Sequence, residues 1–284
     1  MATTIWGTSS SWTLTALPLF VWMGEILFRT KLSENLFKGL SPWMQKLPGG
    51  LIHVNVVGCA LFAAISGSSA ATVATVGKMS IPELRKRNYP EKILLGSLAG
   101  SGTLGLLIPP SIILIIYGVA VQESIAKLFI AGIIPGIMIA LIFMSYVIIW
   151  SLINKKSMPK IIEEYSFFEK IKRSKQLLPV IILILAVIGS IYTGIATATE
   201  AASLGVVGAL ILSYFQKSLT LKTFKSSLLG ATKTSCMIAF ILAGSTFLSL
   251  AMGFTGLPRN LALWIQNMEL SPYVLIFVLS LIHI

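Results

Sequence analysis

The chain has 284 residues, of which 55% are hydrophobic and 11% are charged, and its mean hydropathy is +0.87. A chain with so few polar residues cannot cover the surface of a water-soluble globular protein. The composition therefore predicts an integral membrane protein. All ten acidic residues are Glu, which excludes Asp dyads and Asp-based metal motifs, and the two cysteines and two histidines are isolated from one another. Disulfide frameworks, zinc sites and Cys/His nucleophile pairs are therefore disfavoured.

The net charge of +12 comes from 22 Lys and Arg residues that lie between apolar runs. Most of the excess falls in four clusters, at 29–46, 78–92, 155–175 and 217–233. Basic loops between long apolar segments are typical of the cytoplasmic loops of membrane proteins. The charge therefore indicates a lipid bilayer as the partner and argues against binding to nucleic acid.

Stretches without Asp, Glu, Lys or Arg locate the membrane segments. They are 47–77, 93–122, 128–154, 176–199, 201–216 and 234–258, with further apolar stretches at 12–24 and 270–284. A spanning helix needs about 20 residues. The two longest runs, of 31 and 30 residues, are therefore too long for one straight spanning helix.

The first long run has a basic cluster at both ends, so it must enter and leave the membrane at the same face. Its interior carries Ser66, Gly67, Ser68 and Ser69, which can supply both a turn and ligand oxygens. We therefore predict a re-entrant helical hairpin over 49–77 with this sequence at its tip. The alternative is a face of small residues that lets two helices pack closely.

The second long run is interrupted by consecutive prolines, which remove two backbone donors and favour a true break over a simple kink. Backbone that is not helical at membrane depth is tolerated only where it is buried in protein or lines a wet cavity. Its free carbonyls suit a sodium ion, and half-helix N-termini suit an anion. The candidate residues of this break are Gly102, Thr103, Gly105, Ile108, Pro109, Pro110 and Ser111.

Glu200 lies between two apolar segments, and Thr197-x-x-Glu200 fits a helix capping box. We favour this structural role, and keep a direct ion or proton role for Thr197, Thr199 and Glu200 as the alternative. Glu25 could pair with Arg29 one helical turn later. Apolar residues at helical spacing within 32–46 and 159–175 predict two amphipathic helices on the membrane surface.

Many of these motifs occur together, and in the same order, in one known family. The chain resembles the large membrane subunit of TRAP (tripartite ATP-independent periplasmic) transporters, also called DctM-type. The shared blocks are Leu17–Phe20 with Met23–Glu25, Pro48–Leu51, Phe62–Thr72, Gly77 with Ile81–Leu84, Gly102–Ser111, Tyr117-Gly118, Ser124-Ile125, Leu128–Gly136 and Gly194–Ala202. Ala198 departs from the family, which usually has Pro there.

The resemblance implies an all-α, polytopic membrane protein of the ion-transporter-superfamily type, with a re-entrant hairpin and a broken transmembrane helix. It implies a permease in a bacterial inner membrane that takes up an organic anion by elevator-type movement, with Na+ as the coupling ion and no other cofactor. A small DctQ-type membrane subunit and a periplasmic DctP-type binding protein would be its partners. The tip and the break would form the first sodium site and one wall of the substrate site.

Four parts follow from this comparison: a scaffold helix and amphipathic arm at 1–48, half of a transport domain at 49–122, a scaffold helix and connector at 123–176, and the start of a second repeat at 177–284. The family is longer at both ends, and its second hairpin and second Pro-Pro break are not found before residue 284. An ion-coupled anion permease without a binding protein is the main alternative. An intramembrane enzyme with Ser68 or Ser69 as nucleophile and His53 as base is disfavoured, so we expect no enzymatic activity.

Overall fold

A computed structural model describes residue 6 and residues 10–159 and 165–282, and every regular element in these ranges is a helix. The chain divides into two compact units, Ser11–Cys236 and a second one that combines Met1–Ser10 with Met237–Ile284. The candidate site lies entirely in the larger unit. The two units are therefore described separately.

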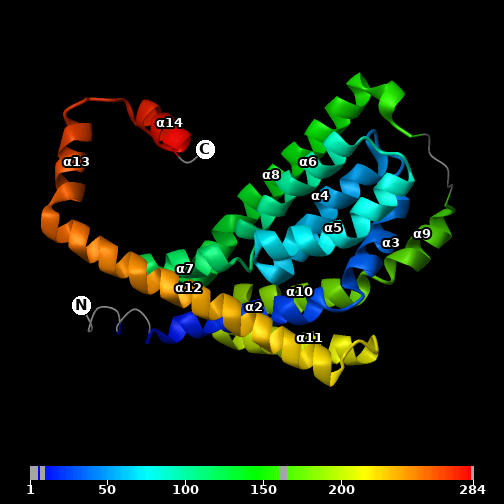
Figure 1. The fold of residues 1–284 in the computed structure, drawn as a ribbon, viewed down its shortest axis with the longest axis horizontal. Coiled ribbons are helices and arrows are strands. Elements are labelled where there is room, and N and C mark those ends of the chain that lie inside the picture. Colours follow the sequence, from blue (N-terminus) through cyan, green and yellow to red (C-terminus); the bar gives the residue numbers. More distant parts are fainter. Residues whose placement is uncertain (1–5, 7–9, 160–164, 283–284) are drawn as a thin grey trace. The chain divides into compact units, whose positions relative to one another are not determined.

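The larger unit begins with the 3-10 turn η1 (Trp12–Thr15), followed by α2 (Ala16–Phe28) and α3 (Leu32–Met44). The chain then forms η2 (Gly50–Ile52), α4 (His53–Ser66), α5 (Ser69–Lys86), α6 (Glu91–Gly102), η3 (Thr103–Leu106) and α7 (Ile112–Val121). After α8 (Ile125–Ile153) and η4 (Lys155–Ser157) come α9 (Phe167–Ser174), α10 (Leu178–Tyr192), α11 (Ala198–Phe215) and α12 (Leu221–Thr255), which crosses into the smaller unit (Figure 1). There, α13 (Leu257–Gln266) and α14 (Pro272–Ile282) follow.

Several of these helices are long and apolar enough to cross a bilayer. In the described part of the chain they are α8, α11 and α12, and the pair α9 and α10 adds a fourth candidate with a 55° bend between its helices. Apolar side chains such as Ile134 and Phe240, 77% and 82% exposed, lie on their outer faces. Such surfaces are compatible with lipid and not with water. The chain is therefore a polytopic, all-helical membrane protein, as predicted.

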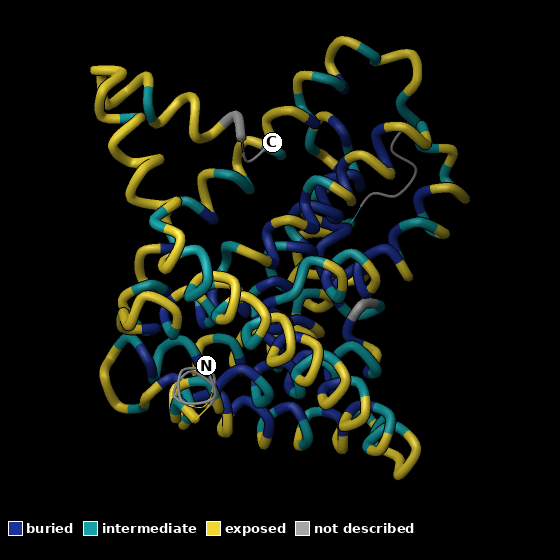
Figure 2. Tube along the Cα trace, turned by 60° about the vertical axis from the view of Figure 1, so that its left-hand side comes forward, coloured by how far each residue is buried: buried dark blue, intermediate teal, exposed yellow. Residues whose placement is uncertain are grey.

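The three helices α4, α5 and α6 pack against one another and form the centre of the larger unit. The side chains of Ile52, Val56, Ile93 and Val147 make a buried cluster at one end of this group. Beside it, α2 packs along α11, and α11 packs on α10. Buried positions gather in the larger unit (Figure 2), whereas α13 contains no buried residue.

Both predicted interruptions are present: the run 47–77 breaks after Ser66, and the run 93–122 breaks between η3 and α7. Two helices extend beyond the charge-free runs into the basic clusters. Helix α5 continues past Lys78 to Lys86, and α12 begins at Leu221, within the basic cluster 217–233. Lys and Arg are good helix formers, so a charged residue marks the end of an apolar run but not the end of the helix.

The predicted surface helices are found in part. The range 32–46 corresponds to α3, whose apolar residues Leu32, Leu36 and Leu40 are buried. The range 159–175 contains α9 at 167–174, while residues 160–164 lie outside the described residues. Glu25 and Arg29 form the expected ion pair one turn apart.

Candidate ion and anion site

The turn between α4 and α5 is made by two residues, Gly67 and Ser68. Gly67 has a φ of 58°, in the left-handed region that glycine adopts without strain, and this ends α4. Ser68 is extended, and its hydroxyl accepts a hydrogen bond from the Ala71 N–H at 3.5 Å, which caps α5. Because α4 and α5 pack on each other, the segment is a helical hairpin with Gly67 and Ser68 at its tip.

Hydroxyl groups around the tip bond to one another and to the turn. The hydroxyls of Ser66 and Thr72 lie 3.0 Å apart, and that of Thr72 also donates to the Ser68 carbonyl at 2.8 Å. Thr72 was not predicted to take part, although a hydroxyl one turn after the cap is a recognisable signal. The tip is therefore a rigid polar turn in a part of the chain that has no charged side chain between Ser66 and Thr72.

The second break has a similar construction. The chain leaves η3 at Leu106, passes through the cis Pro109-Pro110 peptide and enters α7 after Ser111. Ser111 is buried and extended, and its hydroxyl donates to the Leu106 carbonyl and accepts from the Leu114 N–H at 3.4 Å. Ser68 and Ser111 are thus both N-cap serines of a helix that starts at a break.

The structure brings these two breaks into direct contact. The Ile112 N–H donates to the Gly67 carbonyl at 3.2 Å, which joins the tip to the first residue of α7. A Cβ atom on Gly67 would lie 2.6 Å from the Pro110 carbonyl oxygen. A Cβ on Gly105 would lie 2.8 Å from the Ser68 carbonyl carbon. Glycine is needed at both positions because backbone meets backbone.

This contact places two helix N-termini, those of α5 and α7, beside each other. Each carries the partial positive charge of a helix N-terminus, which favours an anion. The C-terminal end of α4 and the 3-10 turn η3 reach the same place and present carbonyl oxygens, which are suitable sodium ligands. The arrangement can therefore hold a cation and an anion without any charged side chain.

Two hydroxyls near the contact are shielded from solvent and lack a hydrogen-bond partner, those of Ser69 and Ser101. A Cβ on Gly102 would lie 3.7 Å from the Ser69 carbonyl oxygen, so the end of α6 lies beside the start of α5. The hydroxyls of Thr75, Ser80 and Ser235 also lack a partner, so Ser69 and Ser101 are candidate ligands because of their place beside the contact. Ser101 was missed by sequence reasoning because α6 also contains Ser97, and the sequence does not show which serine hydroxyl lacks a partner.

Other predicted residues contribute in different ways. Thr103 is exposed, and its hydroxyl donates to the Gly100 carbonyl at 2.7 Å, so it closes the last turn of α6. Ile108 packs against α8, where a Cβ on Gly136 would approach its Cγ1 to 2.9 Å. The close fit of α8 over the break was not predicted. Glycines within an apolar helical run could have indicated this close packing, but such glycines are also common in helices that form no site.

Thr197 and Glu200 form the predicted capping box of α11. The Glu200 carboxylate accepts from the Thr197 N–H at 2.8 Å, and the Thr197 hydroxyl accepts from the Glu200 N–H at 3.3 Å. Glu200 is exposed, and the Thr199 carbonyl accepts from the Ser203 hydroxyl at 3.0 Å. The capping role is confirmed, and a direct role in ion binding remains only a prediction.

The geometry does not assemble a serine nucleophile with a histidine base. His53 is the first residue of α4, and its Nε2 lies 2.8 Å from the Pro48 carbonyl oxygen. Ser66 is the last residue of the same helix, about 20 Å away at 1.5 Å per residue. The imidazole is therefore beyond the reach of the tip.

Comparison with known proteins identifies the family. The model of the tripartite ATP-independent periplasmic transporter, DctM component, matches residues 1–284. The chain belongs to the DctM family. This is a family of transporter components, so an enzymatic function is not indicated for the DctM chain.

Relatives of this DctM chain carry names for different solutes. The C4-dicarboxylate TRAP transporter large permease protein DctM of Pseudomonas aeruginosa is 32% identical over 99% of the chain and 66% of its own length. The sialic acid TRAP transporter large permease protein SiaM of Vibrio cholerae is 32% identical over 97% and 64%. The isethionate TRAP transporter permease protein DctMQ of Oleidesulfovibrio alaskensis is 32% identical over 89% and 40%. The chain thus spans less than two thirds of the length of these relatives.

Proposed function

We propose that this chain forms part of the large permease subunit of a TRAP transporter that imports an organic anion together with sodium. The observation that carries the proposal is the hydrogen bond between the Ile112 N–H and the Gly67 carbonyl, which joins the hairpin tip to the broken helix. Relatives named for C4-dicarboxylate and sialic acid support a carboxylate as the substrate class. The family supports transport as the activity.

In this proposal the helix N-termini at the two breaks bind the substrate, and the backbone carbonyl oxygens at the breaks bind the coupling ion. The N-termini of α5 and α7, with the hydroxyls of Ser68 and Ser69, bind the substrate carboxylate. Carbonyl oxygens at the end of α4 and within the break at 102–111 bind Na+. The unpaired hydroxyls of Ser69 and Ser101 supply further oxygen ligands.

We further propose elevator-type movement, in which the hairpin and the broken helix at 49–122 travel together against a scaffold. Mutual packing of α4, α5 and α6 supports treating them as one moving body. The packing of α2 along α11 supports a scaffold made from the helices on the other side. The divisions at 1–48, 123–176 and 177–284 belong to the same proposal.

A small DctQ-type membrane subunit and a periplasmic DctP-type binding protein are the proposed partners, in a bacterial inner membrane. The tripartite family supports three components, and the name of the DctMQ relative supports a close association of the two membrane subunits. The chain spans less than two thirds of the length of these relatives. Transport is therefore proposed as the activity of the whole permease subunit, and not of these 284 residues alone.

Uptake by proteoliposomes tests the proposal. The complete gene product is reconstituted with its small subunit and binding protein, and radiolabelled C4-dicarboxylates, sialic acid and other organic acids are offered with and without a sodium gradient. We expect sodium-dependent accumulation of one of these acids. Accumulation that needs no sodium would overturn the coupling, and accumulation without the binding protein would favour the alternative permease.

A further inference from the structure

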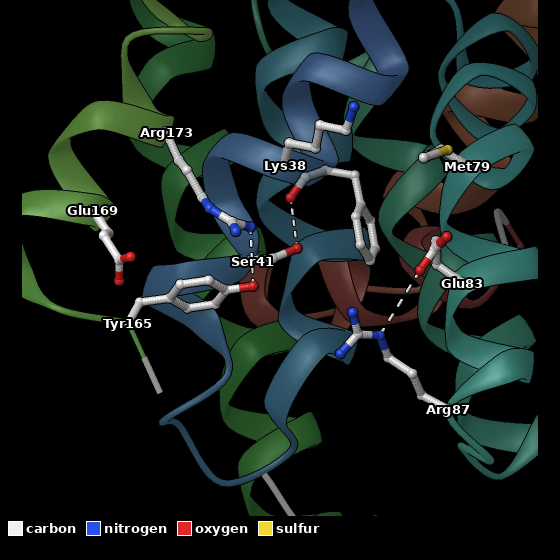
Figure 3. Close-up of a pocket in the computed structure, with 9 residues that line it drawn as sticks. Lys38, Ser41, Met79, Glu83, Arg87, Tyr165, Glu169 and Arg173 are labelled. Carbon is white, nitrogen blue, oxygen red and sulfur yellow. Dashed lines mark hydrogen bonds and ion pairs between the residues drawn. The ribbon is translucent and has the colours of Figure 1, made fainter. Parts of the chain in front are cut away.

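A polar cavity lies at the opposite end of α5 from the tip. It has a volume of about 490 Å³, and α3, the C-terminal part of α5 and the segment around α9 line it (Figure 3). Arg87 is the residue that follows α5, and about 27 Å separate it from Ser69 at 1.5 Å per residue. The cavity is therefore distinct from the site at the hairpin tip.

Each of the three walls contributes one basic side chain, Lys38 from α3, Arg87 from α5 and Arg173 from α9. The Arg173 guanidinium donates to the Tyr165 hydroxyl at 2.9 Å and lies 4.2 Å from the centre of that ring, which holds it in place. In the close-up, Arg173 and Arg87 stand on opposite sides of Ser41 (Figure 3). Two guanidinium groups on facing walls suit an anion with several oxygens.

Two carboxylates also line the cavity, and each has a partner. Glu169 accepts the Ser166 N–H at 3.0 Å and so completes the capping box of α9. Glu83 pairs with Arg87 across 3.8 Å between Oε2 and Nε, a distance longer than a hydrogen bond. Lys38 also has a partner, because its ammonium pairs with Glu34 outside the cavity. An anion would therefore share the guanidinium groups of Arg87 and Arg173 with the groups that they already contact.

The outer side of α9 shows what kind of anion fits. Phe167 and Phe168 are 68% and 77% exposed on a helix of only eight residues, of which Lys170, Lys172 and Arg173 are basic. This helix is turned 55° from α10 and is therefore not collinear with the span that follows it. Exposed aromatic residues beside basic ones are typical of a helix that lies in the headgroup region of a bilayer.

A tryptophan holds α9 in place beside α3. The Trp43 Nε1 donates to the Ser174 hydroxyl at 2.8 Å, and its ring meets Phe167 edge to face with 6.2 Å between centroids. Lys170 lies over the same ring, 5.4 Å from its centre. The aromatic side of α9 and the charged cavity behind it are therefore parts of one fixed arrangement.

We propose that the cavity between α3, α5 and α9 binds the phosphate of an anionic lipid headgroup. The guanidinium groups of Arg87 and Arg173 contact the phosphate oxygens, and Phe167 and Phe168 enter the adjoining acyl region. A free anion would use the basic groups but gain nothing from the exposed aromatic side chains. The site does not depend on transport activity or on the hairpin tip.

Native mass spectrometry of the delipidated gene product tests this assignment. The protein is titrated separately with phosphatidylglycerol and phosphatidylcholine, and the Kd of the first bound lipid is measured. We expect phosphatidylglycerol to bind more tightly, and Arg87→Gln and Arg173→Gln each to weaken it about fivefold, the equivalent of about 1 kcal/mol for one basic residue near an anionic surface. Phosphatidylcholine binding should be unchanged.

A matched control is available next to Arg87. Lys86→Gln removes the same charge from a neighbouring exposed residue outside the cavity, and should change the Kd by less than about twofold. Glu83→Gln removes a carboxylate from the cavity and should tighten phosphatidylglycerol binding, a direction that a misfolded variant would not give.

Three results would overturn the proposal. Equal effects of Arg87→Gln and Lys86→Gln would mean that only overall charge matters. A Glu83→Gln variant that binds phosphatidylglycerol more weakly would mean that the cavity serves only its internal ion pairs. Displacement of phosphatidylglycerol by millimolar inorganic phosphate would make the cavity a site for a free anion.

Discussion

Replacing Gly67 by alanine should disrupt the hairpin tip for two separable reasons. The backbone of Gly67 is left-handed, which costs about 1–2 kcal/mol for a residue with a Cβ. The new Cβ would also lie 2.6 Å from the Pro110 carbonyl oxygen and 3.1 Å from the Ile112 nitrogen, so one backbone segment must move. Such overpacking costs about 1–3 kcal/mol. Together they predict a loss of about 2–5 kcal/mol in folding stability.

Three other glycines separate the two contributions. Gly194 has a φ of 70° and open space around it, so Gly194→Ala measures the backbone cost alone. Gly105 has no positive φ but would place its Cβ against the Ser68 backbone, so Gly105→Ala measures the packing cost alone. Gly96 lies within α6 with nothing within 4 Å, so Gly96→Ala should stabilise the protein by up to about 1 kcal/mol.

Thermal unfolding in detergent and sodium-driven uptake by proteoliposomes would be measured for all four variants. We expect the melting temperature to be lowest for Gly67→Ala, intermediate for Gly105→Ala and Gly194→Ala, and highest for Gly96→Ala. Uptake should fall for Gly67→Ala and Gly105→Ala only, because the first separates the tip from α7 and the second separates the tip from η3. A Gly67→Ala variant no less stable than Gly194→Ala, with normal uptake, would refute the close contact.

Three further predictions concern single polar groups. Ser68→Ala and Ser69→Ala should each weaken the sodium dependence of uptake, and unchanged sodium activation in both would contradict the site assignment. Glu200→Gln should lower the melting temperature slightly through loss of its charge at a helix N-terminus while uptake persists, and lost uptake at an unchanged melting temperature would instead favour an ion-binding role. The Lys38 ammonium lowers the pKa of Glu34 below its ordinary value of 4.5. Above pH 4.5 the ion pair should therefore add well under 1 kcal/mol to the free energy of unfolding, and this contribution should disappear as the pH falls through the lowered pKa. Stability measured against pH for Glu34→Gln should therefore converge with that of the parent in acid, and a constant difference would show that the pair acts by packing.

The interruptions of the two long helices could be predicted because their causes are local. Gly67 ends a helix through its own φ, and Pro109 and Pro110 remove their own N–H groups. The proximity of the two breaks was proposed from the resemblance, but the particular hydrogen bond from Ile112 to Gly67 depends on how three helices pack, which no local pattern specifies.

Other features of the site were not predictable from the residues themselves. A serine such as Ser101 looks the same in the sequence whether its hydroxyl bonds to its own helix or remains unpaired. The end of α5 and the start of α12 do not follow from the charge-free runs, because the change from apolar to charged residues reflects the surrounding solvent, whereas helix length depends on backbone hydrogen bonds and capping.

The joint between the hairpin and the broken helix is made by main-chain atoms, with the Gly67 carbonyl on one side and the Ile112 N–H on the other. Most nearby side chains can therefore be substituted without breaking this hydrogen bond, provided that Gly67 and Gly105 are kept. Under the proposed transport function, solute preference can then change through side chains beside the tip while this main-chain joint stays the same. Substitutions that redirect specificity should accordingly be tolerated far better around the tip than at Gly67 or Gly105.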